Sequence, residues 1–281
     1  MKVYRLDALG TGYADLLRDV EQSGDIVRPR GMEVREVRPL VLEILDPTRS
    51  LVKRPGINRA LMWMEIAQLI AGEWDEGLMR AMSAQAAVLM SAQGAYGPRT
   101  AMQLEQAVLE LVHDADSRRA TVIVARESDL LKARAGANEQ PCTLSWQVFA
   151  RGGRLEMVVS MRSWDLVWGL ANDVPMFTMI QRCLAWALGL EVGTYTHVAG
   201  SGHVYSRHYG LWERVSPTTE RLALVIPRDL PSGFMAQDRW VGVVAGAISA
   251  LRLARVGKLD ELPAHWSHVA PLWKKKLENH G

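Results

Sequence analysis

Two runs of alternating side chains around a glycine pair constrain the fold of this chain most strongly. Leu144, Trp146 and Val148 alternate with polar residues, Leu155, Met157 and Val159 repeat the same spacing, and Gly152-Gly153 lies between the two runs. A period of two is typical of half-buried strands, and adjacent glycines suit the tight turn of a hairpin. The pattern predicts an antiparallel hairpin with Cys142 at its start.

Apolar segments of helical length lie on both sides of this hairpin. One of them lacks proline and glycine and stops at Gly72, a residue type that commonly ends a helix. Another is apolar nearly all round, as a buried helix would be. We expect helices over residues 57–71, 102–111 and 174–188, and further strands over 120–125 and 193–198. The predicted fold class is α/β (α+β), with a mixed sheet covered by helices.

The chain reads as one domain over residues 1–281. It is 48% hydrophobic, which allows a large core, and its prolines and glycines are scattered and not gathered into a linker. The longest apolar stretch, 240–251, is too short to span a bilayer and suits a buried helix. A surface for a partner protein is the alternative for that stretch.

Charge and cysteine usage narrow the class of protein. The 33 basic residues nearly balance the 31 acidic ones, so no long-range field would recruit nucleic acid or an anionic membrane. Cys142 and Cys183 cannot form a disulfide framework, and no Cys and His spacing suits a metal site. The N-terminus lacks the pattern of a secretory signal, so we expect a cytoplasmic protein.

Candidate functional residues gather at the open end of the predicted hairpin, opposite its glycine turn. Cys142 precedes the first strand, and Arg162, Ser163 and Asp165 follow the second, close to where the first begins. An arginine with a hydroxyl could hold a phosphate, and its positive charge would favour the thiolate of the cysteine. A buried thiol and a surface ion pair are the plain alternatives.

Four segments together resemble the thymidylate synthase family in order and spacing. They are Pro141-Cys142, Arg162-Ser163-x-Asp165-x-x-x-Gly169, Gly189-Leu190-Glu191-Val192-Gly193 and His203-x-Tyr205-Ser206-x-His208. The resemblance extends upstream to residues 114–119, to Tyr96-Gly97 and to Glu65. It covers roughly residues 28–216 and leaves a divergent region from about 217. It implies a homodimer that associates through the sheet.

The resemblance implies a reaction and a co-substrate. The thiolate of Cys142 would add to C6 of a pyrimidine nucleotide, so that C5 attacks the methylene group of 5,10-methylenetetrahydrofolate. Glu65 would organise water for proton transfers. Asp165 would contact the pterin ring, and Tyr96 would belong to the folate site. No metal is implied.

The nucleotide-binding residues are also implied by the resemblance. Arg162 and Ser163 would bind the phosphate within the subunit, while Arg118 and Arg119 would reach across the dimer. An N-terminal arginine would join them, for which we prefer Arg28 over Arg30. The sugar hydroxyl would be held by His203 and Tyr205.

One departure from the family pattern bears on the base. Synthases carry an asparagine eight residues after the motif aspartate, and counting from Asp165 brings Asp173 to that position. A carboxyl group suits the amino group and N3 of cytosine better than the edge of uracil. A one-residue slip would instead place Asn172 there and restore uracil.

Two further departures concern the product. The polar end of the chain, 274–281, and the segment 81–87 lack the apolar and tryptophan-rich sequences of the synthases. Both losses favour a wetter site and hence hydroxymethylation, with dCMP as the expected substrate. The alternatives are hydroxymethylation of CMP or dUMP, thymidylate synthesis, and a catalytically silent relative that binds nucleotides or RNA.

Overall fold

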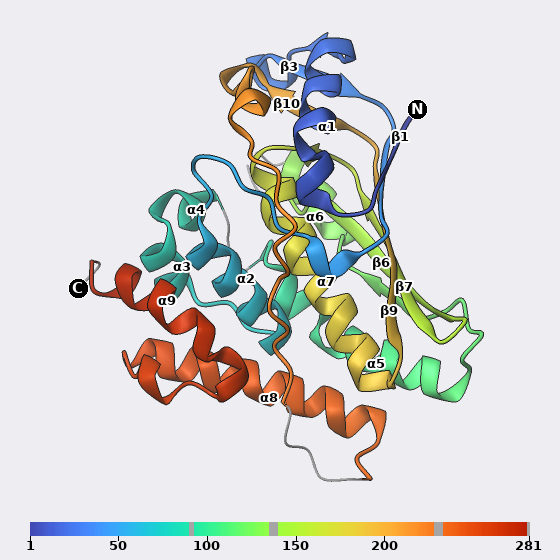
Figure 1. Cartoon of the computed structure of the whole chain (residues 1–281), viewed down its shortest axis with the longest axis vertical. Helices are drawn as coiled ribbons and strands as arrows, with labels where there is room; N and C mark the ends of the chain where they lie inside the picture. Colours follow the sequence, from blue (N-terminus) through green and yellow to red (C-terminus); the bar gives the residue numbers. More distant parts are fainter. Residues whose placement is uncertain (90–92, 135–139, 228–232, 280–281) are drawn as a thin grey trace.

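The computed structural model describes residues 1–89, 93–134, 140–227 and 233–279, and these contain two sheets (Figure 1). The larger sheet has the order β1-β4-β9-β7-β6-β5 and the smaller one β2-β3-β10-β8. The strands are β1 (Lys2–Leu6), β2 (Asp25–Val27), β3 (Val34–Val37), β4 (Leu40–Ile44), β5 (Thr121–Ile123), β6 (Thr143–Arg151), β7 (Arg154–Met161), β8 (Trp164–Asp165), β9 (Glu191–Ala199) and β10 (Gly202–Tyr205). Parallel pairs (β1 with β4, β7 with β9) and antiparallel pairs occur together in the larger sheet, which confirms the predicted mixed sheet.

Helices cover one face of the larger sheet in two layers. They are α1 (Leu9–Ser23), α2 (Arg59–Ala71), α3 (Glu76–Met82), α4 (Ala84–Leu89), α5 (Tyr96–His113), α6 (Glu127–Arg134), α7 (Trp168–Leu188), α8 (Ala236–Arg255) and α9 (Ala270–Leu277). Helix α7 packs on β7 and β9, and α5 packs on β5 and β6. Helices α2 and α8 then pack on α7 and α5 (Figure 1). None of the helices in the described ranges is long and apolar enough to cross a lipid bilayer.

The predicted hairpin is confirmed and fixes the position of the cysteine. Gly152 and Gly153 form the turn with φ angles of 53° and 74°. Cross-strand pairing continues back along β6 and β7 to Thr143. Beyond it, the backbone N–H of Arg162 donates to the carbonyl oxygen of Cys142 at 2.9 Å. The two ends of the hairpin therefore bring the arginine and the cysteine together.

Two predicted helices carry candidate residues, and their predicted bounds agree with the structure to different degrees. Helix α2 ends at Gly72 in the left-handed conformation, as expected. Helix α7 begins at Trp168, six residues before the predicted start. At this start, Oδ1 of Asp165 accepts hydrogen bonds from the N–H groups of Val167 and Trp168, which have no carbonyl partner within the helix, and so stabilises the earlier start.

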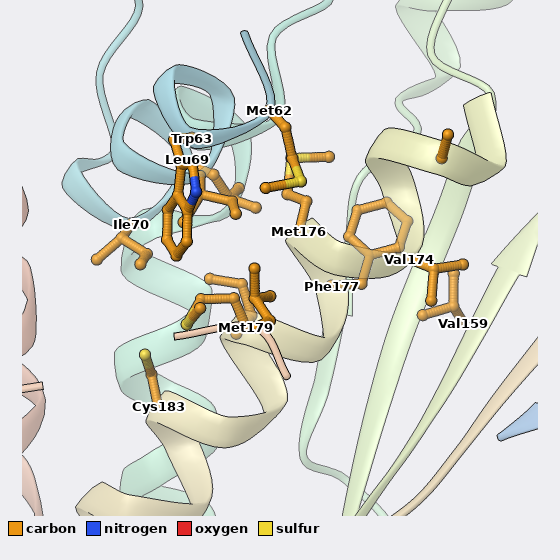
Figure 2. Packing of buried hydrophobic residues seen from close by; sticks show 14 of the residues in the cluster. Met62, Trp63, Leu69, Ile70, Val159, Val174, Met176, Phe177, Met179 and Cys183 are labelled. Carbon is orange, nitrogen blue, oxygen red and sulfur yellow. The ribbon is translucent and has the colours of Figure 1, made fainter. Parts of the chain in front are cut away.

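The centre of the core lies between α2 and α7. Figure 2 shows Trp63 and Ile70 of α2 on one side of α7, with Phe177 of α7 turned toward Val159 on the sheet side. Cys183 lies in this apolar layer and is fully buried. Because the apolar contacts run from the sheet through α7 to α2, side chains on these elements are held in fixed positions.

The small sheet positions the segment that follows the hairpin. Strand β8 runs parallel to β10, with Trp164 opposite Gly202 and Asp165 opposite His203. The N–H of Trp164 donates to the carbonyl of Ser201 at 2.8 Å. This pairing joins two of the sequence motifs side by side.

The opposite face of the larger sheet is partly open in the described part of the chain. Val41, Val158 and Thr196 point away from the helices and are half-buried. Val3 and Ile123, on the two outermost strands, are 59% and 52% exposed. This face is a large, mostly uncharged surface.

The C-terminal region packs on the same core as the rest of the chain. Helix α8 contacts α2, α5 and α7, but it buries one face only, since Val241 is 54% exposed. Trp273 of α9 is buried and its Nε1 donates to the carbonyl of Ala60 in α2. Residues 280–281, which end the polar segment, lie outside the described residues. The assignment of 1–281 to one domain stays a prediction.

Candidate active site

The Cys142 thiol lies at the start of β6 and is half-buried. The guanidinium of Arg162 donates to the carbonyl oxygens of Pro141 and Gln140, at 3.1 and 2.9 Å. Burial raises the pKa of the thiol, while the charges of Arg162 and Arg30 act to lower it. The expected effect of arginine on the thiolate is therefore present, but burial outweighs it within this chain.

Two carboxyl groups face each other across α2 and α7. Burial raises the pKa of Asp173 to about 7, with a further contribution from the charge of Asp165. Burial also raises the pKa of Glu65 to about 8, and the charge of Asp173 adds to this effect. Oε2 of Glu65 is buried and has no hydrogen-bond partner among the described residues. A pair of coupled carboxyls with pKa values near neutrality can bind and transfer protons.

The side chain of Asp173 on α7 is hydrogen-bonded within this cluster. Oδ2 of Asp173 accepts a hydrogen bond from Nε1 of Trp164 at 3.1 Å. The Asp173 charge also acts on Cys142 and Tyr96. Successive residues of a helix point about 100° apart, so Asn172 cannot occupy the same place. The assignment of Asp173 to the base-reading position stays a prediction, and its hydrogen bond to Trp164 favours it over Asn172.

Tyr96 stands at the start of α5 beside the cysteine. Burial raises the pKa of its hydroxyl, and the charges of Asp173 and Cys142 raise it further. Its ring packs against Trp146 and Phe177, with centroids 6.4 and 6.0 Å apart. The phenol is therefore a neutral hydrogen-bonding group at the edge of the cluster.

The sugar and pterin candidates lie together on the small sheet. Asp165 pairs in register with His203, and its charge opposes the lowering of the His203 pKa by burial. The rings of His203 and Tyr205 meet edge to face at 5.1 Å, as two residues on one side of a strand can. Both hydrogen bonds that Asp165 makes to the start of α7 use Oδ1. Its second oxygen can therefore accept from a ligand.

Arg118 and Arg119 lie on the turn before β5, away from this cluster. Arg118 is exposed, and its carbonyl accepts from Gln147, on the face of β6 that points away from the helices. The side chain of Arg119 is 73% exposed and pairs with Glu110 at 2.9 Å. Neither charge acts on the thiol of their own chain.

The remaining candidates for phosphate binding, Ser163, Arg28 and Arg30, differ in their surroundings. Ser163 is half-buried between Arg162 and Trp164. Arg28 is paired with Glu33 at 2.5 Å, whereas Arg30 influences Cys142. Arg30 also holds a φ of 52°, a left-handed conformation that is uncommon for a side-chain residue. The assignment of Arg28 stays a prediction, and the electrostatics favour Arg30.

Two residues of the cluster were not anticipated from the sequence. Trp164 is buried and stacks on His197, with ring centroids 3.7 Å apart and an interplanar angle of 4°. Burial lowers the pKa of His197 to about 3, so this imidazole is neutral. In the described ranges, no group of three or more His, Cys, Asp or Glu residues is arranged to hold a metal ion.

Comparison with known proteins adds three relationships. A sequence model of the thymidylate synthase family matches residues 68–228. A Bacillus phage SP01 protein named deoxyuridylate hydroxymethyltransferase is 28% identical over 223 residues, which are 70% of this chain and 57% of the phage protein. A thymidylate synthase of Bacillus licheniformis is 31% identical over 106 residues, 38% of this chain and 37% of that enzyme. The chain thus spans little more than half the length of the first relative.

Proposed function

Since the chain belongs to the thymidylate synthase family, we propose that it converts a cytidine monophosphate nucleotide, preferably dCMP, into its 5-hydroxymethyl derivative with 5,10-methylenetetrahydrofolate. The observation that carries this proposal is the carboxyl group of Asp173, which faces Glu65 and Cys142 from α7. The hydroxymethyl product has the support of the phage relative's name, and the cytosine base has the support of Asp173 itself.

The proposed chemistry starts at the thiol. Cys142 loses its proton and its sulfur bonds to C6 of the pyrimidine, which makes C5 nucleophilic toward the methylene carbon of the folate. C5 then loses its proton, and tetrahydrofolate departs to leave an exocyclic methylene. Water adds to that methylene, and release of the sulfur from C6 restores the ring. The coupled carboxyls of Glu65 and Asp173 are suited to the proton transfers.

Base recognition follows from the donor and acceptor pattern of cytosine. Its amino group donates and its N3 accepts, so a carboxyl group that carries one shared proton can satisfy both atoms. The pKa of about 7 for Asp173 keeps that proton available near neutral pH. Uracil presents the opposite pattern, an acceptor at O4 and a donor at N3.

The remaining binding roles are part of the same proposal. Arg162, Ser163 and Arg30 would bind the phosphate, and Arg28 is the alternative to Arg30. His203 and Tyr205 would bind the sugar hydroxyl. For the folate, Asp165 can accept from the donor-rich edge of a pterin, with Tyr96 and Glu65 nearby. Homodimerisation through the open face of the larger sheet would bring Arg118 and Arg119 of each subunit into the other's site.

A product assay tests the function directly. The purified protein is incubated with 5,10-methylenetetrahydrofolate and dCMP, CMP or dUMP in turn, and the nucleotides are identified by mass spectrometry. We expect a 5-hydroxymethyl product from dCMP. A hydroxymethylated dUMP, which the phage relative's name makes the second candidate, would overturn the cytosine assignment, and methylated dUMP would overturn the hydroxymethyl product as well.

Mixing two inactive variants tests the shared site. If each site combines Cys142 of one subunit with Arg118 and Arg119 of the other, hybrids of Cys142→Ala with the Arg118→Ala/Arg119→Ala double variant contain one intact site. Random re-association should then restore about a quarter of the wild-type activity. The matched control mixes Cys142→Ala with Glu65→Gln. Because Cys142 and Glu65 of one site belong to the same subunit, each site of that hybrid keeps one defect, and the mixture should restore no activity. No recovery in a pair shown by sizing to form hybrids would refute the sharing.

A further inference from the structure

We infer that Trp164 is a specificity-determining residue, which positions Asp173 for the pyrimidine through its indole N–H; this inference rests on the proposed function. Trp164 is buried, and its Nε1 donates to Oδ2 of Asp173 at 3.1 Å. Trp164 would act through Asp173 and need not touch the substrate.

The direction of the indole N–H is fixed by the strand pairing of Trp164 and by the stacking of its ring. The backbone of Trp164 is paired with β10, and its ring lies parallel to the imidazole of His197. His197 shares a 2.8 Å hydrogen bond with the hydroxyl of Tyr195 and has Phe177 nearby, at 6.4 Å between ring centroids. A neutral, fully buried platform of this kind holds the tryptophan in one rotamer.

Gly169 makes room for the contact. A Cβ at this position would lie 3.1 Å from Oδ2 of Asp173 and 3.5 Å from Cδ1 of Trp164. The first of these distances is tight enough to displace the carboxyl. A residue with a side chain would therefore press on the hydrogen bond between Trp164 and Asp173.

An indole nitrogen can only donate a hydrogen bond, and this property gives the two oxygens of Asp173 different roles. Oδ2 offers a lone pair to Trp164, and this hydrogen bond favours placing a proton of the carboxyl group on Oδ1. Oδ2 keeps a second lone pair for the amino group of cytosine, while Oδ1 shares the proton with N3. In an asparagine at position 173, the same indole would bind the amide oxygen and turn the NH₂ group toward O4 of uracil.

Several charged and titratable groups surround Asp173 besides Trp164. Glu65 of α2 and Asp165 of β8 carry carboxyls, and Tyr96, Cys142 and Tyr195 contribute neutral hydroxyl or thiol groups from three other elements. Of these neighbours, Trp164 supplies the hydrogen bond that favours the charged form of Asp173. Its removal should therefore raise the pKa of Asp173 above about 7.

The test variant is Trp164→Phe, which keeps an aromatic ring on His197 and removes the N–H. The matched control is Trp266→Phe, because Trp266 is equally buried and its Nε1 has no partner among the described residues. Affinities for dCMP and dUMP are measured by calorimetry. We expect Trp164→Phe to lower the preference for dCMP over dUMP about tenfold or more, and Trp266→Phe to leave it unchanged.

A second readout does not depend on any nucleotide. The carboxyl of Asp173 is titrated by carbon-13 NMR in the free protein, with Asp173→Asn to assign its signal. The midpoint should move to higher pH in Trp164→Phe. If that variant does not fold, a benzothienylalanine at position 164 keeps the shape of tryptophan without the N–H and serves in its place.

The outcomes separate this inference from the proposed function. An unchanged midpoint, or equal losses of dCMP and dUMP affinity, would reduce Trp164 to a packing residue and overturn the inference. Failure of the wild-type protein to bind either nucleotide would overturn the proposed function and the specificity role. The NMR midpoint would still test the contact between Trp164 and Asp173 on its own.

Discussion

Replacing Cys142 with alanine should lower formation of 5-hydroxymethyl nucleotide by about 10⁴-fold or more, the scale seen when a covalent enzyme loses its nucleophile. Without the sulfur, no bond forms at C6 and C5 remains too weakly nucleophilic to attack the methylene carbon. Product formation by mass spectrometry measures the loss. A 5-fluoro-dCMP substrate adds a direct readout, because C5 then has no proton to lose and the adduct on Cys142 accumulates on the intact protein.

The second cysteine provides the matched control for this experiment. Cys183 of α7 lies in the apolar core (Figure 2), where burial raises the pKa of its thiol to about 12. Cys183→Ala should therefore retain the adduct and the activity. An adduct that persists in Cys142→Ala, or one that disappears in Cys183→Ala, would contradict the assignment of Cys142 as the nucleophile.

Local sequence patterns predicted the parts of the fold that depend on local chemistry. The alternation around Gly152-Gly153 gave the hairpin, and Gly72 marked the end of α2. The start of α7 was missed, because the first N–H groups of this segment are satisfied by the side chain of Asp165, which the motif had assigned to a ligand. A residue can serve both purposes when its two oxygens are used separately.

The candidate site was predicted where motifs carried it and missed where tertiary pairing creates it. The resemblance named Cys142, Glu65 and Asp173, and the structure brings these three together. Trp164 and His197 are 33 residues apart in the chain, and their stacking depends on the pairing of β8 with β10 and on the place of β9 in the larger sheet. No local sequence pattern in either segment could have predicted the contact between Trp164 and His197.

The choice between the two N-terminal arginines has a similar cause. Arg28 and Arg30 are separated by one residue and are equivalent in composition and local pattern. They differ in the structure, where Arg28 pairs with Glu33 while the charge of Arg30 acts on Cys142. Arg30 also adopts a left-handed backbone conformation, which cannot be inferred from an arginine in sequence.

Asp173→Asn should invert the base preference, with a change in the ratio of dCMP to dUMP turnover of about 10³-fold or more. The amide offers a donor to O4 and an acceptor to N3–H of uracil, while cytosine would leave buried polar groups unpaired. The ratio of kcat/KM values for the two nucleotides measures the change. Asn172→Asp is the matched control, since successive residues of a helix point about 100° apart, and it should keep the preference of the wild type.

The pH dependence of binding distinguishes recognition by a shared proton from simple shape selection. The complex with dCMP would hold one proton between Asp173 and N3, whereas free Asp173 loses its proton above a pKa of about 7. Below that pH the affinity for dCMP should be constant. Above it each binding event takes up a proton, so the Kd should rise about tenfold per pH unit.

Two comparisons isolate this proton in calorimetry at several pH values and in buffers of different ionisation heat. The nucleotide phosphate titrates near pH 6 in both substrates, so the Kd of dUMP corrects for it. Asp173→Asn has no carboxyl to protonate and should lose the slope for dCMP above pH 7. A flat wild-type profile for dCMP, or the same slope in Asp173→Asn, would mean that the carboxyl does not read the base, and cytosine selection would then have to come from elsewhere in the site.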